Sequence, residues 1–220
     1  MIELISIHIP KTAGTSFYKV LSDVYRLDLS PGYRRMDLQD IMDPDGQIEL
    51  KHLTGFRVVH GHFRYAEIRS LHTSTNARII TWLRHPADRV ISNYRFFIDR
   101  LAHPGINPEV SRINQHRRNE RLMEYARLPE NRNRMAYFLE GLNIDDIYFC
   151  GLQEYFEHDL TRLAKKLDWP AIPTPMLNTS RKDYQVTPHE YEEICALNEW
   201  DMALYNRAQF LRDAQLKNRS

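Results

Sequence analysis

The first 26 residues change abruptly from an apolar pattern to a polar turn and then to a helical pattern. Residues 4–9 are mostly β-branched or apolar, as in a buried strand, and Pro10 ends that strand because proline cannot donate to a sheet. A polar turn over residues 11–16 leads into a helix predicted over residues 15–26. This order points backbone N–H groups and the positive end of the helix at the turn, which is the geometry of an anion site.

The same alternation of strand and helix continues along the chain. Apolar runs predict further strands at residues 56–59, 77–83 and 148–150. Helices are predicted over 87–101 and 154–167, and residues 28–50 are expected to form a loop with one short helix. The pattern predicts an α/β fold, a P-loop-type parallel sheet flanked by helices on both faces.

Polar side chains follow three of these predicted strands. Lys11 comes after the first strand, His60 and His62 after the second, and Arg84 after the third. Ligands of parallel α/β sheets bind at the carboxyl ends of the strands. We therefore expect these four residues to share one site.

The turn after the first strand has the residue types that an anion site needs. Lys11 supplies a point charge, Gly14 allows close approach of the backbone, and hydroxyl groups come from Thr12, Thr15 and Ser16. The lysine opens the turn, unlike the lysine of the nucleotide-kinase loop G-x-x-x-x-G-K-[ST]. The alternative is an ordinary strand-to-helix turn that happens to carry these residues.

Two motifs together resemble those of sulfotransferases. Pro-Lys-x-x-Gly-Thr-Ser at residues 10–16 is similar to the 5′-phosphosulfate loop of that family, and Arg-x-Pro-x-x-Arg-x-x-Ser-x-Tyr at residues 84–94 is similar to its 3′-phosphate motif. The resemblance implies the sulfotransferase fold and the donor 3′-phosphoadenosine 5′-phosphosulfate (PAPS), with adenosine 3′,5′-bisphosphate as product and no metal. It implies that PAPS is bound by Lys11, Thr12, Ala13, Gly14, Thr15, Ser16, Arg84 and Ser92. Without the resemblance, Arg84 could pair with Asp88 at the surface and Ser92 could face solvent.

The histidines of His60-Gly61-His62 are spaced so that both point to one side of an extended segment. Histidine suits general-base work because its pKa lies near neutrality. The tripeptide resembles the His-Gly-His of uronyl 2-O-sulfotransferases, which implies that His62 is the catalytic base and that His60 contacts substrate or supports the site. A zinc-binding pair and a core or capping histidine are the alternatives.

Residues 102–142 are expected to form a helical insertion that is dense in arginine. Arg117 and Arg118 are candidates for binding an anionic acceptor. The alternative is a solvated helical face, which is what runs of charge usually are.

The last third of the chain carries one further candidate segment. Asn178, Ser180 and Arg181 resemble a segment that closes over the donor in glycan sulfotransferases, although a polar turn before a helix has the same composition. Thr187-Pro188 predicts a helix start, and the helices that follow are expected to bury Tyr191, Ile194, Leu197, Trp200 and Leu204.

Composition and charge limit the classes of function that are expected. The net charge is only +1, so no strong positive potential would attract nucleic acid. The sequence has no apolar run of about 18 residues, so we expect no membrane anchor and a cytoplasmic location. The two cysteines have no metal-ligand spacing. The sequence predicts one domain, 1–220, that transfers a sulfuryl group to a hydroxyl of a glycan or small molecule. The alternatives are a P-loop small-molecule kinase and a non-catalytic nucleotide- or glycan-binding module.

Overall fold

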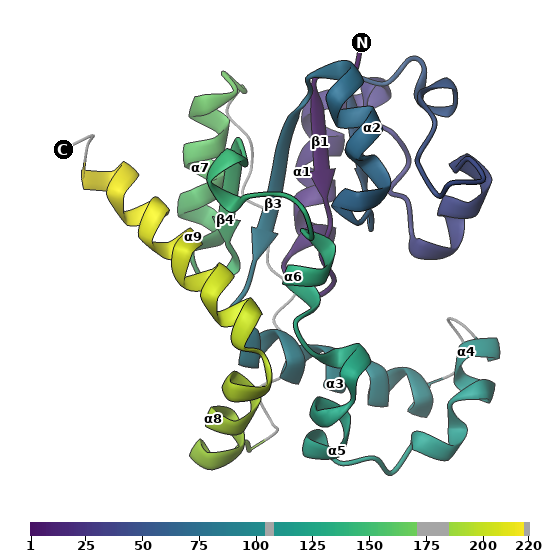
Figure 1. Cartoon of the computed structure of the whole chain (residues 1–220), viewed down its shortest axis with the longest axis vertical. Helices are drawn as coiled ribbons and strands as arrows, with labels where there is room; N and C mark the ends of the chain where they lie inside the picture. Colours follow the sequence, from purple (N-terminus) through teal and green to yellow (C-terminus); the bar gives the residue numbers. More distant parts are fainter. Residues whose placement is uncertain (104–107, 171–184, 218–220) are drawn as a thin grey trace.

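The computed structural model describes residues 1–103, 108–170 and 185–217 (Figure 1). Its four strands form one parallel sheet in the order β2-β1-β3-β4. In the sheet register, Ile7 pairs with both Gly61 and Thr81, so these three strands end at one edge of the sheet. The strands are β1 (Leu4–Ile7), β2 (Val58–Gly61), β3 (Arg78–Leu83) and β4 (Phe149–Leu152). The predicted parallel sheet is confirmed.

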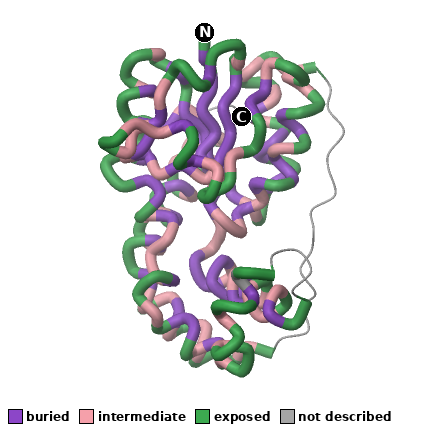
Figure 2. Tube along the Cα trace, turned by 90° about the vertical axis from the view of Figure 1, so that its right-hand side faces the viewer, coloured by how far each residue is buried: buried purple, intermediate pink, exposed green. Residues whose placement is uncertain are grey.

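Helices cover both faces of the sheet, because successive side chains of each strand point to opposite faces. In β1, Leu4 packs on one side with α1 (Gly14–Tyr25) and α7 (Phe156–Lys166). Ile5 and Ile7 pack on the other side. That second face is covered by α2 (Tyr65–Thr75), α6 (Arg134–Phe138) and α9 (Glu199–Lys217). Figure 2 shows the strands as a buried layer between these helices.

A separate group of helices lies beyond the carboxyl ends of the strands (Figure 1). It has its own apolar cluster, built around Val90, Tyr125 and Ile194. Its members are α3 (Pro86–Ala102), α4 (Pro108–Ile113), α5 (Leu122–Arg127) and α8 (Pro188–Leu197). The carboxyl edge of the sheet therefore faces this helical group rather than open solvent alone.

Several element boundaries differ from the predicted ones. β2 begins two residues later than predicted, so His60 and Gly61 lie inside the strand. β4 continues through Gly151, where a Cβ atom would lie 2.4 Å from the Trp82 ring. The helix α2 was not predicted, and residues 28–50 contain parts of several 3₁₀ turns rather than a loop with one short helix.

The prediction that Trp200 points inward is wrong, because its side chain is 66% exposed. The buried side of α9 is formed by Asp201, Tyr205, Ala208 and Arg212, at helical spacing. Trp200 precedes that row by one residue and is therefore turned about 100° away from it. Ile194 is buried as expected.

Candidate functional site

The turn between β1 and α1 has the backbone of an anion-binding nest. Lys11 and Ala13 both adopt the left-handed conformation, with φ of 72° and 71°. The first hydrogen bond of α1 runs from the amide of Phe17 to the carbonyl of Ala13, so the amides just before Phe17 have no partner within the helix. Alternating left-handed residues with free N–H groups form a concavity that suits an anion. The left-handed conformation is strained for residues other than glycine, and such strain is found most often at functional turns.

The hydroxyl groups of this turn differ in their surroundings. Thr12 is buried and its Oγ1 donates to the carbonyl of Ile9 at 2.8 Å, so it fixes the shape of the turn. Thr15 is exposed, and Ser16 is buried. Thr15 has the most accessible hydroxyl of the three.

Gly14 makes room for a residue that the sequence analysis did not single out, His8. A Cβ atom on Gly14 would lie 1.8 Å from Cδ2 of His8. Any larger residue at position 14 would displace that ring. A close approach at Gly14 was expected, and the group that approaches in this structure is the imidazole of His8.

Three histidines lie together at the ends of β1 and β2. The ring centroids of His8 and His62 are 4.0 Å apart, and those of His8 and His60 are 5.1 Å apart. Nδ1 of His62 lies 2.8 Å from the carbonyl oxygen of His8. Because a carbonyl can only accept, Nδ1 carries the proton and Nε2 of His62 is left with a free lone pair. That is the tautomer a general base at Nε2 requires.

His60 lies deeper than His62. Its side chain is only 2% exposed, and its Nδ1 lies 2.8 Å from Oγ of Ser6, its partner in the sheet register. Its Nε2 is buried without a hydrogen bond. This placement favours a supporting role over direct contact with a substrate, and a substrate contact stays a prediction.

Burial keeps all three imidazoles neutral near pH 7. Desolvation lowers the pKa of His60 to about 3 and that of His8 well below its usual range. It also lowers the pKa of His62, where the carbonyl of His8 opposes the shift and Arg35 adds to it. A neutral His62 can accept a proton over the whole neutral range.

Lys11 and Arg84 bring the turns after β1 and β3 together. Nη1 of Arg84 lies 3.4 Å from the carbonyl oxygen of Lys11, and Nζ of Lys11 lies 4.2 Å above the ring of Phe96. Desolvation lowers the pKa of both groups, and the charge of Arg84 lowers that of Lys11 further. No ion pair with Asp88 forms at Arg84 among the described residues. Two half-buried cations that raise the positive charge of one region favour binding of an anion there.

Two further residues of the 84–94 motif, Arg89 and Tyr94, connect the helices around the site. Ser92 is buried, so it is not the solvent-facing residue of the alternative interpretation. Arg89 is buried as well, with Nη2 donating to the carbonyl of Asn131 at 3.0 Å and Nε 3.8 Å from Oδ2 of Asp201. The hydroxyl of Tyr94 donates to the carbonyl of Glu120 at 2.9 Å.

The predicted acceptor arginines have different partners. Nε of Arg117 lies 2.8 Å from Oε2 of Glu120, and its guanidinium lies over Phe97. Arg118 is exposed. A role for either in acceptor binding stays a prediction, as does a role for Asn178, Ser180 and Arg181, which lie outside the described residues.

Within the described residues, no three His, Cys, Asp or Glu side chains are arranged to hold a metal ion.

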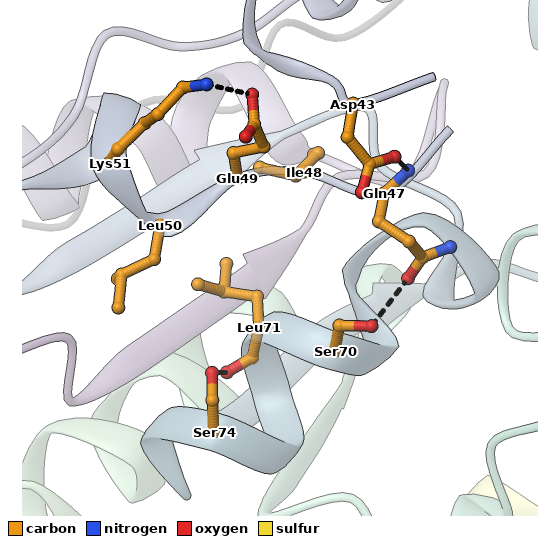
Figure 3. Close-up of a pocket in the computed structure, with 9 residues that line it drawn as sticks. All are labelled: Asp43, Gln47, Ile48, Glu49, Leu50, Lys51, Ser70, Leu71 and Ser74. Atoms are coloured by element: carbon orange, nitrogen blue, oxygen red, sulfur yellow. Dashed lines mark hydrogen bonds and ion pairs between the residues drawn. The ribbon is translucent and has the colours of Figure 1, made fainter. Parts of the chain in front are cut away.

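A hollow is present elsewhere, beside the carboxyl-terminal half of α2 and so near the start of β3 rather than the ends of the strands (Figure 3). Its polar groups pair with one another, as in the 2.7 Å ion pair of Lys51 and Glu49. It is lined by Asp43, Gln47, Ile48, Glu49, Leu50, Lys51, Ser70, Leu71 and Ser74.

His8 could have been found from the sequence. Ser6 and His8 alternate with Ile5, Ile7 and Ile9, which puts both polar residues on the same face of the strand. In the parallel register this face meets His60. The pattern was visible, but the pairing of β1 with β2 was not.

Known proteins with a similar fold include a bacterial sulfotransferase. The structure is similar to that of a sulfotransferase from Alicyclobacillus acidocaldarius, with a TM-score of 0.55 and 17% identity over 93% of this chain and 94% of that chain. A mouse sulfotransferase, SULT7A1 complexed with PAP, aligns with a TM-score of 0.45 and 13% identity over 89% of this chain and 62% of that chain. No curated protein matches the sequence. No described helix is long and apolar enough to cross a membrane. The family model of the sulfotransferase domain matches residues 1–157, and the chain therefore belongs to the sulfotransferase domain family.

Proposed function

We propose that this PAPS-dependent sulfotransferase transfers the sulfuryl group to a hydroxyl of a carbohydrate, with His62 as the general base. The family membership establishes sulfotransfer and disfavours the kinase and the non-catalytic module. The carbohydrate acceptor and the roles of individual residues are the proposal. One observation carries the role of His62: its Nδ1 is committed to the carbonyl of His8, which leaves Nε2 free.

The turn after β1 suits the sulfonate end of the donor. Its left-handed residues, Lys11 and Ala13, open a concavity beside the Lys11 ammonium. Arg84 joins this turn through the carbonyl of Lys11, and with Ser92 it would hold the 3′-phosphate. When bound, PAPS supplies an activated sulfuryl group whose transfer resembles phosphoryl transfer, in which catalysis consists of positioning and charge stabilisation.

The residues then divide the work of the transfer. Nε2 of His62 takes the proton of the acceptor hydroxyl as its oxygen bonds to sulfur. Lys11 stabilises the negative charge that develops on the leaving phosphate oxygen. Arg84 and Ser92 fix the register of the nucleotide, so that attack and departure are in line.

Calorimetric titration tests the nucleotide part of this proposal. We expect the wild-type protein to bind adenosine 3′,5′-bisphosphate tightly without Mg²⁺, and ATP weakly. Arg84→Ala should weaken binding of the bisphosphate by about tenfold or more, because a charge-assisted contact is lost. Preference for Mg·ATP would overturn the assignment of the 3′-phosphate site.

The role of His62 is tested separately. His62→Ala should lower kcat for sulfuryl transfer by about 10² to 10⁴, the usual contribution of a general base, with the affinity for the bisphosphate unchanged. His60→Asn, which keeps a polar partner for Ser6, is the matched control and should retain most of the activity. A His62→Ala protein that kept full kcat, or lost nucleotide binding instead, would contradict the assignment.

A further inference from the structure

Three arginines that belong to no predicted site meet beside His62. We call Arg35, Arg64 and Arg134 the arginine cluster. Nη1 of Arg35 donates to the carbonyl of His62 at 3.2 Å and lies 2.6 Å from Oε2 of Glu67. Arg64 follows His62 by two residues in an extended segment, and its Nε lies 2.7 Å from Oε1 of Glu67. Two of the three cations are therefore anchored to the segment that carries the proposed base.

Tyr137 links these two arginines to the third. Its hydroxyl accepts from Nη1 of Arg64 at 2.9 Å, and the guanidinium of Arg134 lies 4.4 Å from its ring centroid. Arg134 also lies 5.6 Å from the ring centroid of Phe138. Such cation–π contacts offset the mutual repulsion of guanidinium groups that are held together.

Arg134 has no hydrogen-bond acceptor and no ion-pair partner among the described residues, although its side chain is half-buried. Burial lowers its pKa, and the nearby charge of Arg35 lowers it further. A guanidinium has five N–H donors in a planar fork, and a half-buried fork without acceptors is unfavourable. A planar anion would supply the acceptors that this fork lacks.

The charges of the cluster do not balance. Glu67, which is buried, is the acid that pairs with Arg35 and Arg64. Asp201 also attracts Arg134, but its carboxylate accepts from the amides of Met135 and Ala136 and faces Arg89. Three cations therefore share one dedicated carboxylate, and about two positive charges remain beside the site.

The position of the cluster is fixed by the fold. The carboxylate of Asp201 holds the start of α6, the helix that carries Arg134 and Tyr137. Arg35 and Arg64 are held by Glu67 in the first turn of α2. A binding surface with rigid, preorganised cations loses little side-chain entropy when an anion binds.

We propose that the arginine cluster is an acceptor subsite that binds a carboxylate carried by the acceptor sugar or by its neighbour in a glycan. The fork of Arg134 binds the carboxylate oxygens, and Arg64 and Arg35 add positive charge from the side of His62. The subsite makes the enzyme selective for acidic over neutral acceptors. This inference deepens the proposed function and depends on it.

Binding of glucuronate and of glucose tests the subsite, because the two sugars differ at C6 by a carboxylate in place of a hydroxymethyl group. Each is titrated into the protein with and without adenosine 3′,5′-bisphosphate. We expect glucuronate to bind the wild-type protein at least about tenfold more tightly, since hydrogen bonds to charged groups contribute more than neutral ones. Arg134→Ala should abolish the preference, and Arg134→Lys should retain part of it.

Arg121→Ala is the matched control, because Arg121 is 82% exposed and pairs with Glu124. It should leave the preference unchanged. Arg134→Gln, closer in shape to arginine, serves if the alanine variant unfolds. Equal binding of the two sugars to the wild type, or a preference lost in Arg118→Ala and kept in both neutral Arg134 variants, would overturn the subsite.

The same titrations separate this inference from the proposed function. If adenosine 3′,5′-bisphosphate binds and the protein shows no preference for glucuronate over glucose, only the proposed subsite is wrong. If the bisphosphate does not bind, the nucleotide site is wrong, and the sugar titrations without nucleotide still decide on the cluster.

Discussion

Two regions of this protein are rich in arginine, and they differ in how those arginines are paired. In residues 112–132, Arg117 pairs with Glu120, Arg121 with Glu124, and Arg127 with Glu193. In the arginine cluster, Arg35 and Arg64 share Glu67, and Arg134 faces aromatic rings. Each of these three arginines of the first region has a carboxylate of its own, whereas the three arginines of the cluster share one. The density of a charged residue along the chain therefore does not locate a binding site, because neighbouring acids cancel the charge.

The same contrast separates buried from exposed ion pairs. Arg89 and Asp201 are both buried, whereas Arg207 and Asp145 are about 40% exposed. A buried charge that loses its partner cannot be solvated by water, and an exposed one can.

Asp201→Ala should have the largest effect on stability. It leaves Arg89 buried without its carboxylate and leaves the amides of Met135 and Ala136 without an acceptor. We expect the free energy of unfolding to fall by about 3 to 5 kcal/mol, measured by chemical denaturation. Asp145→Ala, which removes the same side chain from an exposed pair, should change the midpoint little. Equal effects of the two substitutions would refute the contrast.

Acidification should destabilise the protein through its buried histidines. Because the pKa of His60 is lowered to about 3, the unfolded chain binds more protons than the folded one below pH 6.5. The stability that depends on neutral His60 is therefore fully present above pH 6.5 and is lost as the pH falls toward the pKa of the folded state. His60 alone should account for about 2 kcal/mol between pH 7 and pH 5.

The measurement is the free energy of unfolding at several pH values, in the wild type and in His60→Asn. The difference between the two isolates His60 from the other titrating groups. A slope that is the same in both proteins would show that His60 is protonated as easily in the folded state as in the unfolded one.

Gly14→Ala should have an intermediate effect. Its Cβ would overlap the ring of His8, and overpacking of this kind costs about 1 to 3 kcal/mol. The His8→Ala, Gly14→Ala double variant should recover part of the loss, because the overlap disappears. Thermal unfolding of the two single variants and the double variant measures the coupling, and strictly additive effects would contradict it.

Arg121→Ala should have the smallest effect. Its ion pair with Glu124 is solvent-exposed, and such pairs are largely screened by water and salt. We expect an unchanged unfolding midpoint and an unchanged rate of sulfuryl transfer. A loss of activity would show that residues 112–132 contribute to the site after all.

Much of the candidate site could be predicted because its residues are local in sequence. The run from Lys11 to Ser16 is continuous, and Arg84 directly follows a strand that the apolar pattern identifies. The family match is consistent with both motifs. The structure adds that Arg89, within the second motif, is buried against Asp201 instead of lying open to a ligand.

Some elements could not be predicted because the signal was weak or depended on packing. The helix α2 has only a modest apolar face, and its start depends on Glu67 accepting from the amide of Arg64. Trp200 looked like a core residue by type, but the buried face of α9 is set by contacts with the sheet. A large apolar residue next to a buried row follows the geometry of the helix rather than its own hydrophobicity.

The sequence by itself determined the parallel α/β fold, the strand ends that carry polar residues, and the loop typical of sulfotransferases, because apolar periodicity and short motifs are local properties. Only the tertiary structure decided which polar groups meet. It placed the carbonyl of His8 against His62 and brought Arg134 to Arg35 and Arg64 from a distant part of the chain. The physical reason is that pairing, burial and desolvation depend on distances between segments that sequence spacing does not specify.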